Sequence, residues 1–286
     1  MLRSLLLLGA FLFAFSICAQ DWCKKNDPAK LSRSPSTFAN KLVSDRFFHS
    51  INPNPVDFHN TQIEIATIFS PEHYQNGHWS SYDSRMQAYS VYNSYMLKHG
   101  FYKDLELHVC FTNLILSAEN EIKEHGRESM NTGLSIGLNY SFYQSKNRKT
   151  HVGLYGQITI PKIKAEASTL FSPEIRLLYA RSIGKRINFF LNLGGIYGTN
   201  MQKACLLYNL SLVRSIGERF EVFTEFYKNY TKTGPARNTS KRYLFGLGFY
   251  FHENIYCYSS IEGGWAKEDT INDFRTDLGI SIRINR

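Results

Sequence analysis

The final stretch of the chain alternates between apolar and polar positions without a break. One parity, from residue 274 to residue 284, is apolar except for Thr276, and the other carries Arg275, Asp277, Gly279, Ser281 and Arg283. A period of two is typical of a β-strand whose two faces meet different surroundings. In a soluble sandwich the apolar face packs on a core, whereas in a membrane barrel it meets lipid. This strand is consistent with both.

The same alternation returns in other parts of the chain. It is clear at 105–112, 134–142, 187–193 and 243–251, where every second residue is Leu, Ile, Val, Phe or Tyr. Weaker versions lie near 61–69, 85–98, 149–160, 173–182, 203–214, 219–229 and 254–265. The pattern predicts about twelve strands of roughly 9–13 residues, the length that a tilted strand needs to cross the hydrocarbon layer of a membrane.

The connections between these segments alternate in length. Short turns are expected at KHGF, QSKNR, SIGKR, SIGER and FHEN, and most junctions between them are longer, including those at 113–129 and 228–240. Tight periplasmic turns alternating with longer external loops are typical of outer-membrane barrels. We therefore predict an all-β fold over 61–286, a transmembrane antiparallel β-barrel of about twelve strands in meander order. A soluble sandwich or jelly roll is the alternative.

The chain opens with Arg3, an apolar run from Leu5 to about Ile17, and a small-residue region before Asp21. This is the pattern of a secretory signal peptide over residues 1–20, which predicts export to the cell outer membrane. Residues 21–60 show no sustained period and are broken by Pro28, Pro35, Pro53 and Pro55. We predict that this segment is either a periplasmic tail or a plug inside the barrel.

The chain has a formal net charge of +9 and an aromatic content of 15%, with 21 Phe and 18 Tyr. A basic excess often suits nucleic acid, but an exported chain without a nucleic-acid motif is not expected to bind it. The aromatic excess suits the girdles that a barrel places at the two membrane interfaces. The cysteines form neither a CxxC pair nor a metal cluster with histidine, so we expect ordinary strand residues and no cofactor. Those outside the predicted signal peptide, which contains Cys18, are Cys23, Cys110, Cys205 and Cys257.

Parity in the predicted strands assigns a set of charged side chains to the barrel interior. Acids outnumber arginines there, so the interior either favours cations and polar solutes or holds a salt-bridge network that fills a narrow barrel. The predicted lumen-lining residues are Glu64, Asp104, Glu106, His108, Glu174, Arg176, Glu221, Glu225, Arg242, Glu262, Arg275, Asp277 and Arg283.

Two segments resemble a known family. SDRFFHSINPNPVDFHNTQIEIATIF at 44–69 and YMLKHGFYKDLELHV at 95–109 are similar to the outer-membrane β-barrel transporter family named after the meta-pathway of phenol degradation, in its Bacteroidetes form. Phe47 stands where that family has proline, and Lys98 stands near its turn arginine. The resemblance implies a transport barrel without catalytic residues, so no enzyme is expected. The matching positions are Ser44, Asp45, Arg46, Gln62, Ile63, Glu64, His99, Gly100, Leu105, Glu106 and Leu107.

These observations predict an outer-membrane channel or transporter for small solutes. Its partners would be outer-membrane lipid and an unidentified solute, and the oligomeric state stays open. One alternative is a surface barrel that binds a partner through its long connections, above all 113–129. Another is a lipid hydrolase, which would need a serine with a base in reach. Its candidate residues are His78, Ser80, Ser81 and His108.

Overall fold

The computed structural model describes Leu42 and residues 50–72, 74–75, 78–79, 87–119, 128–160, 172–197, 205–233, 236–265 and 274–284. The chain divides into two compact units, Met1–Ser36 and Thr37–Arg286, and every described residue belongs to the second. The predicted signal peptide and most of 21–60 lie outside the described residues. In the described part of the chain, no helix is long and apolar enough to span a membrane.

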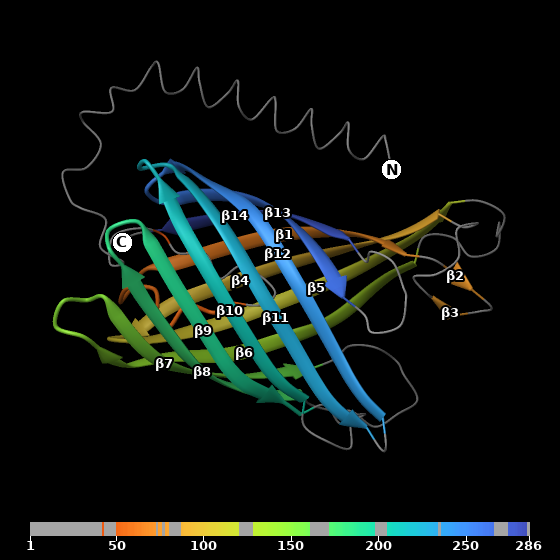
Figure 1. Cartoon of the computed structure of the whole chain (residues 1–286), viewed down its shortest axis with the longest axis horizontal. Helices are drawn as coiled ribbons and strands as arrows, with labels where there is room; N and C mark the ends of the chain where they lie inside the picture. The colour runs from red at the N-terminus through yellow and green to blue at the C-terminus, as the bar shows by residue number, and fades with distance from the viewer. Residues whose placement is uncertain are drawn as a thin grey trace, which may run out of the picture. The chain divides into compact units, whose positions relative to one another are not determined.

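Twelve antiparallel strands close into a barrel, and each pairs with its neighbour in the sequence (Figure 1). A separate short pair, β2 (Tyr74–Gln75) and β3 (His78–Trp79), lies between the first two barrel strands in the chain. The meander prediction is confirmed. The barrel strands are β1 (Thr61–Glu72), β4 (Gln87–Tyr102), β5 (Leu105–Glu119), β6 (Glu128–Gln144), β7 (Thr150–Ile160), β8 (Ser172–Ile183), β9 (Ile187–Ile196), β10 (Cys205–Ile216), β11 (Phe220–Thr233), β12 (Ala236–His252), β13 (Ile255–Trp265) and β14 (Arg275–Ile284).

Closure depends on the pairing of the first and last strands. Residues of β1 pair with β14 from Thr61↔Ile284 to Phe69↔Thr276. An open sheet would leave the edge N–H and C=O groups of both strands unpaired, and lipid cannot hydrogen-bond them. The alternating row at the end of the sequence therefore continues to Ile284 because this strand completes the ring.

Several strands are longer than the sequence pattern predicts. β4, β6 and β12 have 16, 17 and 17 residues. The loop expected at 228–240 is a strand hairpin, because β11 ends at Thr233 and β12 begins at Ala236. The loop expected at 113–129 is likewise mostly strand, since only residues 120–127 separate β5 from β6. In the β11–β12 hairpin, threonine, tyrosine and asparagine extend the ladder, because strand formation does not require an apolar row.

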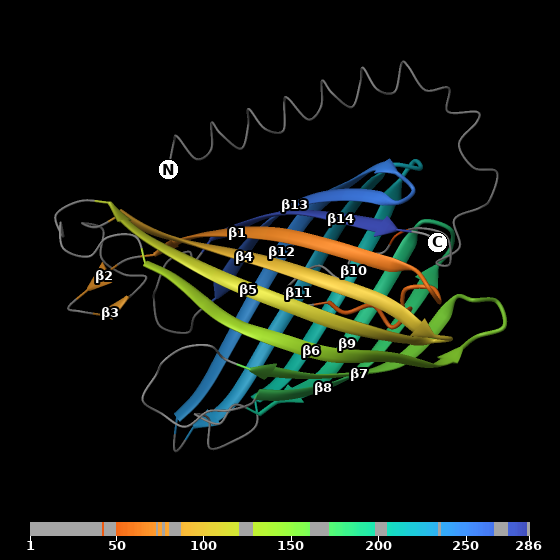
Figure 2. The same ribbon diagram turned by 180° about the vertical axis from the view of Figure 1, so that it is seen from behind.

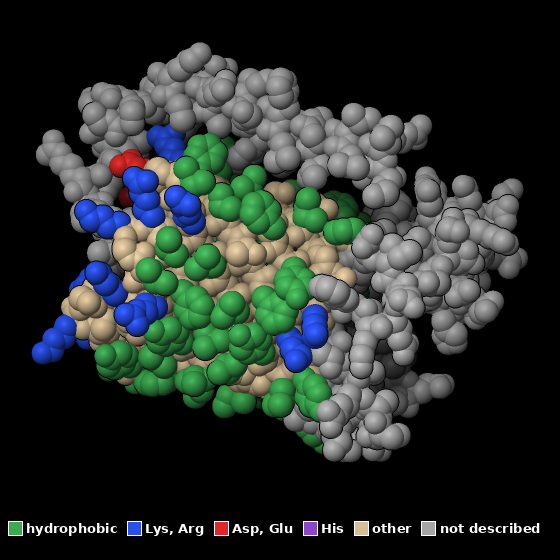
Figure 3. Space-filling model, viewed as in Figure 1, with side chains coloured by type: hydrophobic (Ala, Val, Ile, Leu, Met, Phe, Trp, Pro, Cys, Tyr) green, Lys and Arg blue, Asp and Glu red, His purple; other side chains and the backbone are tan. Residues whose placement is uncertain are grey.

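Parity separates the outer wall of the barrel from its interior. On β6, Leu138 is 46% exposed while the adjacent Asn139 is 1% exposed. The outward positions of the other strands are likewise Leu, Ile, Phe and Tyr in the main, and Figure 3 shows these apolar side chains spread over the outer face. An exposed apolar belt of this kind suits contact with lipid rather than water.

Inward-facing rings lie flat over glycines of the neighbouring strand. A Cβ atom on Gly248 would stand 2.0 Å from the Tyr256 hydroxyl oxygen, and one on Gly279 would stand 2.3 Å from ring carbons of Tyr258. Both tyrosines are buried, as is Phe223 beside Gly246. The glycines of GLGFYF thus leave room on the inner face of β12, and aromatic rings fill that room.

Candidate functional site in the barrel interior

The interior wall carries paired charges. The Lys98 ammonium of β4 lies 2.5 Å from a Glu64 oxygen of β1, and Arg242 of β12 lies 2.7 Å from Glu262 of β13. Two further pairs join residues on the same strand and face, His108 with Glu106 and Arg176 with Glu174. Lys98, Arg176 and Arg242 each contact a carboxylate, so Glu64, Glu174 and Glu262 are neutralised locally. Glu106 is hydrogen-bonded to the His108 ring.

Three other predicted acids, Asp277, Glu221 and Glu225, are hydrogen-bonded. The Ser260 hydroxyl donates to Asp277 at 2.9 Å, and the Ser215 hydroxyl donates to Glu221 at 3.2 Å. Glu225 accepts from the Asn209 amide. Arg283 donates from Nε to the Asn254 side chain at 3.0 Å, near the end of β14.

The charged side chains are buried although they face the barrel interior. Glu64 has no exposed surface, and Lys98 and Glu106 are each only 2% exposed. In a wide aqueous pore, side chains on the wall would be reached by solvent. The interior at these levels is therefore packed with side chains, as the salt-bridge interpretation of the sequence expects.

One predicted lining residue is misplaced, and one lining residue was missed, for the same reason. The sequence pattern placed the first short turn at 98–101, but β4 continues to Tyr102 and the chain reverses at Lys103 and Asp104. Asp104 is exposed in that turn with a φ of 62°, a left-handed conformation that Asp tolerates. Lys98 instead lies inside β4 and points inward. Its parity with Ser90 and Ser94 is the signal that could have identified it.

A short segment before β1 crosses the interior, visible between the front and back walls in Figure 2. We name residues 50–56 the lumen strap. The Ser50 hydroxyl contacts Ser211 of β10 and donates to Glu225 of β11 at 2.6 Å. The strap is thus attached to the wall opposite the strand that it leads into.

Wall amides hold the backbone of the strap. Asn192 of β9 donates to the Ile51 carbonyl at 3.1 Å, and Asn139 of β6 donates to the Asn52 carbonyl at 2.9 Å. These bonds satisfy carbonyl groups that a chain outside regular structure would otherwise leave unpaired in a buried place.

The strap then meets the near wall. The Val56 N–H donates to a Glu106 oxygen at 2.6 Å, so this carboxylate serves both His108 and the strap. Beyond the strap, the His59 N–H donates to the Gly100 carbonyl at 2.7 Å. From Ser50 to His59 the chain therefore passes from β10 and β11, across the interior, to β4 and β5.

An apolar cluster fills another part of the interior. Leu42 is fully buried with Phe223, Tyr250 and Tyr256, and its carbonyl accepts a hydrogen bond of 3.0 Å from the Tyr250 hydroxyl. Residues well before β1 thus contact the inner wall as well.

Comparisons with known proteins place this architecture. The chain resembles an outer-membrane channel from Pseudomonas putida F1, with a TM-score of 0.63 and 12% identity over 85% of this chain and 100% of that one. It resembles the NanC porin with a TM-score of 0.55 and 9% identity, over 78% of this chain and 100% of that one. It resembles the KdgM porin with a TM-score of 0.51 and 7% identity, over 78% of this chain and 99% of that one. The chain has the fold of outer-membrane channels and porins. No protein-family model matches it, and neither does any curated protein.

In this outer-membrane barrel fold, the candidate hydrolase residues do not assemble into a described site. His108 faces the interior and pairs with Glu106, so it does not lie on the lipid-facing wall where acyl chains would reach it. Ser80 and Ser81 lie outside the described residues, and His78 lies in β3. Cys110, Cys205 and Cys257 lie on strands, where the sequence analysis expected them, and they are free thiols.

Exposed basic side chains gather at the end of the barrel that carries the short turns (Figure 3). Among the described residues these include Lys146, Arg148 and Lys149 between β6 and β7, and Lys185 and Arg186 between β8 and β9. Part of the net positive charge of the chain therefore lies in these turns, outside the barrel interior.

Proposed function

We propose that the protein is an outer-membrane channel for small polar solutes, and that the lumen strap is its gate. The observation that carries the proposal is the set of hydrogen bonds joining residues 50–56 to strands on opposite walls. A solute crossing this level must displace the strap or pass beside it. The plug role expected for part of 21–60 is thus assigned to a specific segment.

The outward face supports the membrane location. Its exposed apolar row matches the lipid-facing band of such barrels, and the connections at one end are short while most at the other are longer. Both ends of the barrel sequence, Thr61 and Ile284, lie at the short-turn end, which is the periplasmic side in this class. Membership in the Bacteroidetes transporter family is part of the same proposal, supported by the segments at 44–69 and 95–109.

The hydrogen bonds of the strap suit a gate more than a permanent core. Asn139, Asn192 and Ser211 hold it through neutral groups, each worth about 1 kcal/mol net. The carboxylates of Glu225 and Glu106 add two bonds, each worth about 1.5–3 kcal/mol. A few such bonds can be exchanged for bonds to water when the strap leaves. The paired charges on the wall, in contrast, stay together whether or not the strap is present.

A disulfide lock tests the gate. Ser50→Cys and Ser211→Cys are combined in a chain whose four mature-chain cysteines are replaced by alanine, because the two serine hydroxyls are already in contact. Conductance is recorded in planar bilayers under oxidising and reducing conditions. We expect discrete current steps in the reduced protein and their loss on oxidation, with recovery when reductant is added.

Single-cysteine variants are the matched controls and should respond to neither treatment. Equal conductance of the oxidised and reduced double variant would refute the gate. If the unmodified protein inserts but is silent, Asn139→Ala with Asn192→Ala should release the strap and produce steps. Continued silence of that variant would refute the channel.

A further inference from the structure

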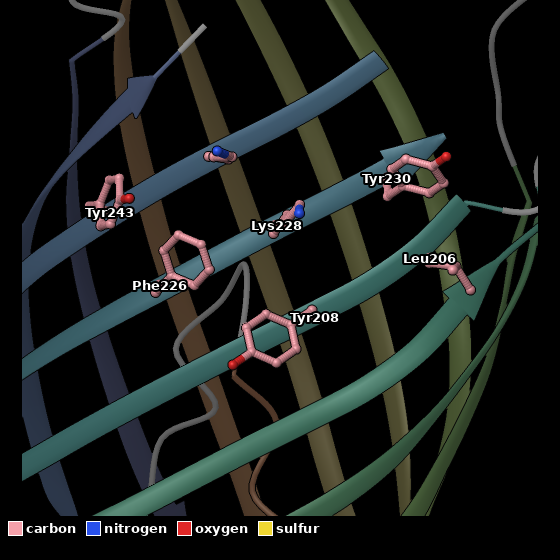
Figure 4. Close-up of a pocket in the computed structure, with 7 residues that line it drawn as sticks. Leu206, Tyr208, Phe226, Lys228, Tyr230 and Tyr243 are labelled. Carbon is pink, nitrogen blue, oxygen red and sulfur yellow. The ribbon is translucent and has the colours of Figure 1, made fainter. Parts of the chain in front are cut away.

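A groove lies on the outer wall across three adjacent strands, β10, β11 and β12. Its volume is about 520 Å³, and Figure 4 shows Tyr243, Phe226 and Tyr208 in a row across it. We name it the outer groove. Its lining residues are Leu206, Tyr208, Phe226, Lys228, Tyr230, Lys241 and Tyr243. All have outward parity, so the groove belongs to the surface and not to the interior.

Two lysines face each other within this apolar wall. Lys228 of β11 and Lys241 of β12 are register partners, and Tyr208 of β10 is the partner of Lys228 on the other side. Like charges directly opposite each other on a sheet repel and destabilise it. An anion bound between them would remove that repulsion.

The described outward positions of the three strands supply no such anion. Where their side chains are described, β10, β11 and β12 present only apolar, aromatic, threonine and basic residues outward, with Arg214 the other cation. A cation pair in contact with hydrocarbon is unfavourable, so lysines of a membrane wall reach toward the headgroups. The negative charge that balances the two lysines must therefore come from a group outside these strand faces.

The position of the groove along the barrel indicates which headgroups it meets. Lys228 is eight residues beyond the start of β11 at the short-turn end, while only Asn229–Thr233 follow before the opposite end. The tyrosines around it correspond to the aromatic girdle at a membrane interface. With the short turns on the periplasmic side, this interface faces the outer leaflet.

We propose that the outer groove binds the phosphate group of an outer-leaflet glycolipid, with Lys228 and Lys241 on the phosphate and the tyrosine and phenylalanine rings against its sugar and acyl chains. The inference rests on the proposed membrane location. A phosphate monoester carries a charge of about −1.5 to −2, which two ammonium groups balance. Hydroxyls of Tyr208, Tyr230 and Tyr243 supply hydrogen-bond donors at the same place.

The test is a native mass spectrometry titration of the full-length protein in detergent, with diphosphoryl lipid A and its dephosphorylated form as probes. We expect the phosphorylated lipid to bind more tightly. Lys228→Gln with Lys241→Gln should weaken its binding by roughly tenfold to thirtyfold, since each basic residue near a lipid surface contributes about fivefold. The dephosphorylated lipid should bind both proteins equally.

The matched control is Lys146→Gln with Lys149→Gln, which removes the same charge from the turn between β6 and β7. It should bind as the unmodified protein does. Unchanged binding by the Lys228 and Lys241 variant, or an equal loss in the control, would overturn the site. Displacement of the lipid by millimolar inorganic phosphate would assign the groove to free phosphate instead.

Folding and channel function are followed separately. Heat-modifiable migration reports that the barrel is intact, and the Lys228 and Lys241 variant should conduct as the unmodified protein does. If the unmodified protein does not conduct but still prefers the phosphorylated lipid, the result counts against the proposed channel and not against the groove. Intact conductance with no phosphate preference would count against the groove alone.

Discussion

Lys98 shows how a single side chain decides the character of the interior. It is almost fully buried, 2.5 Å from Glu64, and the Gln62 amide donates to the same carboxylate at 2.6 Å. A buried ion pair of this kind contributes little net stability, because both ions have lost their water. Removing one partner is costly, because the other charge remains buried.

Glu64→Gln should therefore destabilise the barrel by about 3 kcal/mol or more. The measurement is the urea midpoint of the loss of the compact, heat-modifiable band in lipid vesicles. The double change Glu64→Gln with Lys98→Met removes both charges and should recover most of the loss. A double variant as unstable as the single one would contradict the ion-pair interpretation.

The residue scale also marks the limit of parity as a guide. Alternation in the sequence assigns Glu64, Glu106, Glu225 and Asp277 to the inner face, and all four are buried. It does not reveal that Glu225 meets Ser50, a residue 175 positions away in the chain. Such contacts depend on where a segment without any periodicity runs, and no local pattern carries that information.

At the scale of elements, one turn accounts for two errors. Moving the reversal from 98–101 to Lys103 and Asp104 takes Asp104 off the strand and places Lys98 on it. The register between β4 and β5 shifts between Gly100 and Tyr102, where Gly100 approaches the backbone of Val56 and Asp57. The glycine is therefore a close-packing position rather than the turn residue that its type suggests.

β12 and β13 are joined by ring-over-glycine packing, which gives a test of the inner wall. Gly248→Ala should destabilise the barrel by about 1–3 kcal/mol, since the new methyl group would collide with the Tyr256 ring. Thermal loss of the heat-modifiable band is the measurement. Gly156→Ala is the matched control, because its methyl group would meet only the Glu174 carbonyl at 3.9 Å. Equal losses in both variants would show that backbone effects dominate.

At the scale of the whole molecule, the barrel and the lumen strap differ in how they are held. The barrel has a closed ring of backbone ladders, whereas the strap depends on a few side chains such as Asn139 and Asn192. Regions with few stabilising contacts open locally at lower free energy than the rest of a protein.

Asn139→Ala with Asn192→Ala should speed amide hydrogen exchange in residues 50–56 by about tenfold or more while the strands keep their protection. Hydrogen exchange with mass spectrometry in lipid nanodiscs measures both regions at once. Asn188→Ala is the control, since its side chain accepts from Ser182 and has no described bond to the strap. Faster exchange throughout the barrel would mean that these amides support the fold and not the strap alone.

The sequence alone determined the strand class, the twelve-strand meander, the outward apolar rows and the short-turn end, because each depends on a local period of two or on a turn. The tertiary structure decided what the interior contains. Whether the carboxylates of Glu106 and Glu225 face water or bind the strap depends on contacts between segments far apart in the chain. Whether Lys228 and Lys241 face each other depends on the register of the β11–β12 hairpin. The closed barrel brings the strap and the wall strands together, and no local stretch of sequence specifies the contacts of the strap.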